Sequence, residues 1–231
     1  MSATPQVIGH RGWPARFPDN TLAGFLAASI VADAVELDVR RCSDGKLVLS
    51  HDPELGGLVV AEHPWSELAE VDLGDGHHPA LLDELLAALP DLPIQFEIKN
   101  LPFQPGFEPD HRVALEAAER ARPGDIVTSF YWPSLGAVRS AFAEVATGVL
   151  VGHSGDLGSA IESALQGGHA AVLPHVGLPR EEMARALEKG IEVIPWVVDE
   201  ASLARELAGF GVSGIITDDP ALIRSALGGN Q

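Results

Sequence analysis

The chain has 231 residues, and 46% of them are hydrophobic. This suffices for a substantial core, and α/β barrels commonly use about this length for one domain. The formal net charge is −18, which argues against a nucleic-acid partner because phosphate backbones are bound by clustered positive charge.

The sequence also indicates the cellular compartment of the protein. Cys42 is the single cysteine, so an internal disulfide is excluded and a reducing compartment fits. The amino terminus lacks a basic segment followed by an apolar stretch, and no stretch reaches the roughly 18 apolar residues of a membrane span. We therefore expect a cytoplasmic protein without a stable membrane anchor.

Short runs rich in β-branched residues alternate along the chain with Ala- and Leu-rich runs of helical period. The candidate strands are residues 7–10, 34–39, 94–98, 125–130, 147–151, 170–174, 192–197 and 214–217. The candidate helices are residues 21–31, 81–89, 113–122, 134–142, 157–166, 181–189, 201–209 and 220–227, with helix-start residues at Asp19 or Asn20, Asp83, Pro133, Pro179 and Asp219. Eight strand-helix units with short turns favour a (β/α)8 TIM barrel over an open doubly wound sheet.

One crossover is longer than the others. Asp44-Gly45 predicts a turn, and residues 46–50 alternate like a strand, so a hairpin should follow the second barrel strand. Residues 55–79 have no clear period. We predict a short insertion at about residues 52–79 within a single domain that spans residues 1–231.

Four short segments carry most of the reactive side chains, and each can be read as the carboxyl end of a strand. They are His10-Arg11-Gly12, Glu36-Leu37-Asp38, His51-Asp52 and Glu97-Ile98-Lys99. Active-site groups of α/β barrels lie at the carboxyl ends of the strands. We therefore expect these side chains to converge on one rim of the barrel.

Carboxylates dominate two of these segments. Glu36 and Asp38 are two residues apart, so a strand points both to the same side. Two close carboxylates repel unless they are neutralised, and a hard divalent cation with oxygen ligands is the usual solution. Glu97 can complete this metal site, while Lys99 can face a substrate anion.

Two histidines and an arginine add groups that can transfer protons and contact phosphate, which a metal-assisted hydrolysis needs. One of His10 and His51 can accept a proton from the nucleophile while the other protonates the leaving oxygen. The guanidinium of Arg11 suits two phosphate oxygens, although it could equally brace the carboxylates. This inventory favours phosphodiester cleavage, with structural histidines and a rim salt bridge of Lys99 as the alternatives.

The ordered motifs resemble those of the glycerophosphodiester phosphodiesterase family. The resemblance covers nearly the whole chain, through His10-Arg11-Gly12, Pro18-Asp19-Asn20-Thr21, Glu36-Leu37-Asp38-Val39, Asp44-Gly45, His51-Asp52, Glu97-Ile98-Lys99, Ser129-Phe130, Trp196-Val197-Val198 and Thr217-Asp218-Asp219-Pro220. Asp19 stands where the family usually has Glu. The stretch after Asp52 lacks the family's Arg-Thr-Thr, so the preference for a headgroup is not readable.

The resemblance implies a metal-dependent barrel enzyme that hydrolyses small-molecule glycerophosphodiesters to an alcohol and glycerol 3-phosphate. By this resemblance His10 and His51 are the acid/base pair, and Glu36, Asp38 and Glu97 bind one divalent cation, Mg²⁺ or Ca²⁺. Arg11 and Lys99 would hold phosphate. Initial attack by the adjacent glycerol hydroxyl and direct attack by water both stay open, as does the oligomeric state.

Other readings are also open. Trp196 either floors the glycerol pocket or is a buried aromatic of the barrel, and Asp218 is expected to accept backbone hydrogen bonds at the end of the eighth strand. A lysophospholipase D would need an apolar entrance, for which the insertion offers Leu55, Leu58, Val59, Val60 and Trp65. A non-catalytic phosphate-ester binding barrel is the alternative from a different class.

Overall fold

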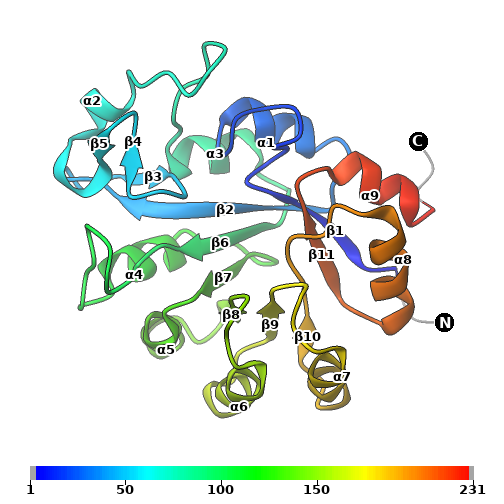
Figure 1. Cartoon of the computed structure of the whole chain (residues 1–231). Coiled ribbons are helices and arrows are strands. Elements are labelled where there is room, and N and C mark those ends of the chain that lie inside the picture. Colours follow the sequence, from blue (N-terminus) through cyan, green and yellow to red (C-terminus); the bar gives the residue numbers. More distant parts are fainter. Residues whose placement is uncertain (1–3, 229–231) are drawn as a thin grey trace.

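A barrel of parallel strands forms the centre of the protein (Figure 1), whose computed structural model describes residues 4–228. The barrel strands are β1 (Gln6–His10), β2 (Ala34–Arg41), β6 (Ile94–Ile98), β7 (Ile126–Ser129), β8 (Ala146–Val151), β9 (Ala171–Pro174), β10 (Glu192–Val193) and β11 (Gly214–Thr217). They are hydrogen-bonded in the order β10-β9-β8-β7-β6-β2-β1-β11. Backbone hydrogen bonds from Ser213 to Val193 (2.9 Å) and from Ile216 to Pro195 (3.1 Å) join β11 to the β10 region. The predicted TIM barrel is confirmed, although β10 is shorter than the predicted strand.

Helices surround the barrel on the outside (Figure 1). They are α1 (Leu22–Ala28), α3 (Leu82–Ala88), α4 (Arg112–Ala118), α5 (Trp132–Ala141), α6 (Leu157–Gly167), α7 (Arg180–Glu188), α8 (Ala201–Phe210) and α9 (Pro220–Ala226). Outward-facing strand residues such as Leu37 and Phe96 belong to the large core shared with these helices, whereas Ile8, Ile194 and Ile216 belong to a separate apolar cluster. Because strand residues alternate between faces, this division separates the barrel interior from the helix layer.

The start of α1 differs from the sequence-based expectation and bears on the site. Thr21 is the N-cap and accepts a hydrogen bond from the backbone of Gly24, so the assignment of the cap to Asp19 or Asn20 was wrong. Asn20 has a positive φ of 58° and uses its side chain elsewhere, donating to Asp38 at 2.8 Å. At α3, Asp83 lies in the first turn, as expected of a helix-start residue, and the backbone N–H of Leu81 donates to Glu84 (3.0 Å).

The predicted hairpin is present and leads into the insertion. Strand β3 (Leu47–Leu49) pairs antiparallel with β2. It is followed by β4 (Glu54–Leu55), β5 (Leu58–Val59), the 3-10 helix η1 (Val60–Glu62) and α2 (Trp65–Leu68).

The apolar residues of the insertion form a small core of their own. Leu55, Val60 and Leu68 are buried together with Cys42 and Val48, and Leu58 and Trp65 pack against this cluster. These side chains therefore contribute to packing within the insertion.

Between residues 4 and 228, no helix is both long and apolar enough to cross a bilayer. The first three residues, where the sequence predicts no secretory signal, lie outside the described range.

Candidate active site

Three buried carboxylates meet inside the barrel. One oxygen from each of Glu36, Asp38 and Glu97 lies within 4.8 Å of the others, and the three residues are 2%, 0% and 7% exposed. Asp38 on β2 is directly opposite Glu97 on β6 in the parallel register. The expected convergence of these three side chains follows from that register and from the alternation along β2.

Asp38 is surrounded by donors. Its carboxylate contacts Lys99 Nζ at 2.9 Å and Arg11 Nε at 3.1 Å, and accepts a hydrogen bond from Asn20 Nδ2 at 2.8 Å. Burial alone would raise the pKa of Asp38, but the charges of Lys99 and Arg11 outweigh burial and hold this pKa at about 2. Asp38 is therefore a charged group at neutral pH.

Glu36 has a different environment. Its Oε2 accepts a hydrogen bond from the backbone N–H of Arg11 (3.1 Å), whereas its Oε1 is buried and has no hydrogen-bond partner among the described residues. Burial and the neighbouring charge of Asp38 raise the pKa of Glu36 to about 8. A cation at the unpaired oxygen would supply the missing partner and would favour the deprotonated form of Glu36.

The charges and donor atoms of this cluster fit a divalent cation. When Glu36 is deprotonated, three carboxylates face two side-chain cations, Arg11 and Lys99, so a further positive charge would be accommodated. The ligand atoms are all carboxylate oxygens, which hard cations such as Mg²⁺ and Ca²⁺ prefer.

His10 lies beside Glu36 and is held by an aspartate from the other end of the chain. Its Nδ1 is 2.6 Å from Asp218 Oδ1, and its Nε2 is 3.9 Å from Glu36 Oε2. A carboxylate accepts hydrogen bonds, so Nδ1 carries the proton and Nε2 faces the carboxylates. Burial lowers the pKa of His10, but the hydrogen bond to Asp218 and the charge of Glu36 raise it above its ordinary value overall.

Asp218 is a residue of the site that the sequence analysis interpreted only as a strand-end acceptor. In the β1–β11 register Gly9 is opposite Thr217, which brings the next residues of the two strands, His10 and Asp218, side by side. In a closed barrel the last strand pairs with the first. The predicted barrel therefore already implied that residues at the ends of the first and eighth strands lie close together.

Asp218→Asn is expected to lower the pKa of His10 because the substitution removes the carboxylate that favours the imidazolium. An NMR titration of the His10 ring in the cation-free protein measures this change. Asp52→Asn is the control, because Asp52 contacts the other histidine. An unchanged or raised pKa of His10 in Asp218→Asn would show that Asp218 has no such effect.

His51 reaches the site through the predicted hairpin. It does not end a barrel strand; it follows β3, which runs antiparallel to β2 and returns the chain to the level of Asp38, where the Ser50 N–H donates to the Asp38 carbonyl (3.0 Å). The His51 carbonyl accepts hydrogen bonds from Arg40 Nε (3.2 Å) and Nη2 (2.7 Å). Its ring Nδ1 is 2.8 Å from Asp52 Oδ1.

A cavity of about 280 Å³ adjoins this second histidine. It is lined by residues of the first βα loop and of the insertion, including Arg11, Asn20, His51, Asp52 and Glu54. The insertion therefore forms one wall beside the carboxylate cluster.

The two cations predicted to hold phosphate are both engaged with carboxylates. Arg11 contacts Asp19 through Nη1 (2.8 Å) as well as Asp38. Lys99 is 8% exposed and forms ion pairs with Asp38 and Glu97.

Trp196 belongs to an aromatic group at the same rim. Its ring meets Phe130 edge-on at 5.6 Å and His175 at 5.2 Å, and its Nε1 donates to the Leu173 carbonyl at 2.9 Å. The ring packs against the apolar cluster inside the barrel. Lys99 Nζ is 5.9 Å from the centre of the Phe130 ring, which joins this group to the carboxylates.

Comparisons with known proteins agree with this geometry. The model of the glycerophosphoryl diester phosphodiesterase family matches residues 10–222. A glycerophosphodiester phosphodiesterase of Caldanaerobacter subterraneus subsp. tengcongensis is 29% identical, over 93% of this chain and 94% of that protein.

Solved structures show the same fold. The glycerophosphodiester phosphodiesterase of Thermotoga maritima has a TM-score of 0.80 at 27% identity, covering 97% of this chain and 99% of its own. A phosphodiesterase of Oleispira antarctica, solved in complex with the product sn-glycerol-3-phosphate, has a TM-score of 0.86 at 23% identity and covers 97% of both chains. The chain belongs to the glycerophosphoryl diester phosphodiesterase family, and the prediction that it is a phosphoric diester hydrolase is confirmed.

Proposed function

We propose that this protein, as a single domain, hydrolyses glycerophosphodiesters to an alcohol and glycerol 3-phosphate with one divalent cation, Mg²⁺ or Ca²⁺. The observation that carries the proposal is the cluster of Glu36, Asp38 and Glu97. In it, Glu36 Oε1 has no hydrogen-bond partner among the described residues, and Glu36 Oε2 is 3.9 Å from His10 Nε2. The three carboxylates would hold the cation. When bound, it supplies positive charge that stabilises the charge developing on the phosphoryl oxygens.

The two histidines are assigned the proton transfers. Asp218 fixes the proton of His10 on Nδ1, which leaves Nε2 to exchange a proton at the reacting phosphate. Asp52 does the same for His51. One imidazole takes the proton from the attacking oxygen, which belongs to water or to the adjacent glycerol hydroxyl, and the other donates a proton to the leaving oxygen. If the glycerol hydroxyl attacks first, water then opens the cyclic phosphate to give glycerol 3-phosphate. Both would need to act in one turnover, which accounts for two carboxylate-partnered histidines at one site.

Arg11, Lys99 and Trp196 are assigned to substrate. Arg11 and Lys99 keep positive charge beside the carboxylates, where a phosphate group would contact them. The ring of Trp196 offers an apolar surface to the carbon atoms of glycerol.

Cation binding is expected to strengthen as the pH rises towards 8. Glu36 has a pKa of about 8 in the cation-free protein, and its carboxylate must be deprotonated to act as a ligand. At pH 7 binding should therefore release about one proton. Isothermal titration calorimetry with Mg²⁺ in buffers of different ionisation enthalpy measures this release. An affinity that is constant between about pH 6 and pH 8.5 would contradict the assignment of Glu36 as a ligand.

Hydrolysis assays test the function against a non-catalytic binding barrel. Glycerophosphocholine, glycerophosphoethanolamine, glycerophosphoglycerol and bis(p-nitrophenyl) phosphate are supplied with Mg²⁺, Ca²⁺ or Mn²⁺. The proposal predicts release of glycerol 3-phosphate from at least one glycerophosphodiester. Binding of these esters without any turnover would favour the binding barrel. A lysophospholipase D gains no support from the insertion, because its apolar residues pack against one another.

A further inference from the structure

Gln95 is a buried amide inside the barrel. Phe96 belongs to the outer core, so its neighbours Gln95 and Glu97 on β6 both face the interior. Gln95 is 2% exposed, and neither its Oε1 nor its Nε2 has a hydrogen-bond partner among residues 4–228. Burial of an unpaired amide is unfavourable, so its retention calls for a partner that the apolar packing does not supply.

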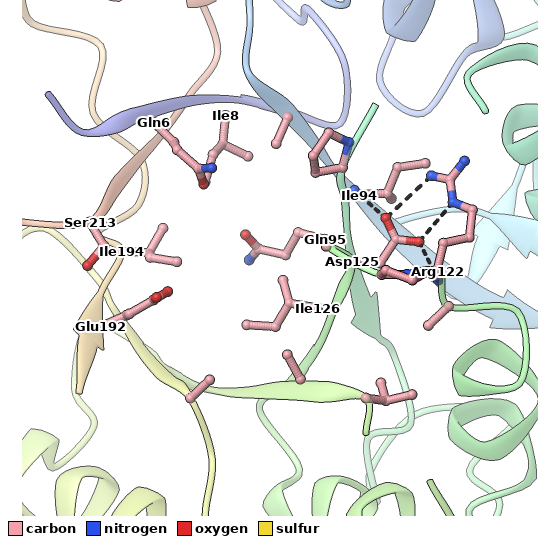
Figure 2. A pocket seen from close by; sticks show the side chains of 18 of the residues that line it. Gln6, Ile8, Ile94, Gln95, Arg122, Asp125, Ile126, Glu192, Ile194 and Ser213 are labelled. Carbon is pink, nitrogen blue, oxygen red and sulfur yellow. Dashed lines mark hydrogen bonds and ion pairs between the residues drawn. The ribbon is translucent and has the colours of Figure 1, made fainter. Parts of the chain in front are cut away.

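On one side, Gln95 adjoins a cavity at the amino ends of the strands. The cavity has a volume of about 1060 Å³. In Figure 2 the side chain of Gln95 extends into the barrel between the apolar side chains of Ile8, Ile126 and Ile194. These neighbours offer no hydrogen bond.

Charged residues also line this cavity, and two of them, Arg122 and Asp125, are paired with each other. Arg122 donates to Asp125 (3.0 Å) and to the Leu89 and Leu92 carbonyls (2.8 and 2.9 Å). Glu192 is exposed at the start of β10.

On the other side, Gln95 adjoins the carboxylate cluster. It is directly opposite Glu36 in the β2–β6 register, so the two side chains leave adjacent strands towards the same interior. Strands lie about 4.8 Å apart, a distance that two long side chains bridge directly or through one water. Glu36 Oε1 is an unpaired acceptor and Gln95 Nε2 an unpaired donor.

We infer that Gln95 is a positioning residue of the cation site: its amide donates to Glu36 through one buried water and keeps that carboxylate turned towards Asp38 and Glu97. The inference rests on the proposed cation site. Groups that orient metal ligands typically change metal affinity by about 10–100-fold when they are removed. Gln95 thereby separates the carboxylate cluster from the cavity at the amino ends of the strands.

The test compares two substitutions that keep the shape of the side chain and remove its amide. Gln95→Met is the test variant. Gln6→Met is the matched control, because Gln6 lines the same cavity from β1 (Figure 2). Calorimetric titration with Mg²⁺ and the melting temperature of the cation-free protein are measured for both. We expect Gln95→Met to bind Mg²⁺ about 10–100-fold more weakly and Gln6→Met to bind as the parent does, while the melting temperatures show that both variants are folded.

The outcomes separate the two claims. If the parent binds neither Mg²⁺ nor Ca²⁺, the proposed cation site fails, and the inference fails with it. If the parent binds and Gln95→Met binds equally well, the inference alone is overturned. Equal weakening in both variants would assign Gln95 to packing of the barrel and would also overturn the inference.

Discussion

His10→Ala is expected to lower kcat by about 10²–10⁴-fold, the usual contribution of a positioned general acid or base. The effect should fall on kcat because the carboxylates that would hold the cation remain in place. Initial-rate kinetics with glycerophosphocholine, together with Mg²⁺ affinity by calorimetry, measures both quantities. His51→Ala should give a loss of similar size, since two proton transfers are needed.

The matched control is His63→Ala. His63 also pairs with a carboxylate, Glu67 at 2.7 Å, but it lies in the insertion next to α2. This variant should retain the activity of the parent. If His10→Ala kept the parental kcat, the assignment of His10 to proton transfer would be wrong.

Glu36→Gln is expected to weaken Mg²⁺ binding by about 100-fold or more, beyond the range for groups that only orient a ligand. The amide oxygen that replaces Oε1 is uncharged and binds a hard cation less strongly. Cation-dependent activity should fall in parallel. Glu119→Gln is the control, because it makes the same change of charge at an exposed position of the chain.

The same variant reports on stability without the cation. The pKa of Glu36 in the folded protein, about 8, lies above the ordinary value of 4.5. For a raised carboxyl pKa, stability is highest below the ordinary value and is lost as the pH rises through the folded value. Between pH 5 and pH 8 the cation-free melting temperature of the parent should therefore fall more than that of Glu36→Gln. Parallel curves for the two proteins would contradict the raised pKa.

The carboxylate cluster could be predicted from the sequence because the alternation of side chains along a strand determines which of them share a face. Glu36 and Asp38 share a face of β2, and the parallel register then brings Glu97 beside Asp38. The eight barrel strands were predictable from the same kind of local pattern. Periodicity and β-branched runs act over a few residues, which is the range that a single sequence reports reliably.

Features that depend on distant parts of the chain were harder to predict. The pairing of His10 with Asp218 joins residues 208 positions apart and exists because β11 closes the barrel against β1. The ion pairs of Arg11 and Lys99 with Asp38 depend on three segments that meet only in the folded protein. His51 differs from these cases, because the hairpin that positions it could be predicted from Asp44-Gly45 and from the alternation of residues 46–50.

The preference for one headgroup could not be predicted from the sequence either, because it also depends on tertiary packing. The cavity next to His51 is bounded by the insertion, whose residues 55–79 have no clear sequence period. Its shape depends on the small core around Leu55, Val60 and Leu68, which tertiary packing determines.

The most direct test of the account is the release of glycerol 3-phosphate from glycerophosphocholine as Mg²⁺ is titrated into cation-free protein. The account predicts no product in EDTA, product that increases with Mg²⁺ until one equivalent is bound, and loss of that increase in Glu36→Gln. Equal release of glycerol 3-phosphate with EDTA and with saturating Mg²⁺, or none with Mg²⁺, Ca²⁺ or Mn²⁺, would contradict it.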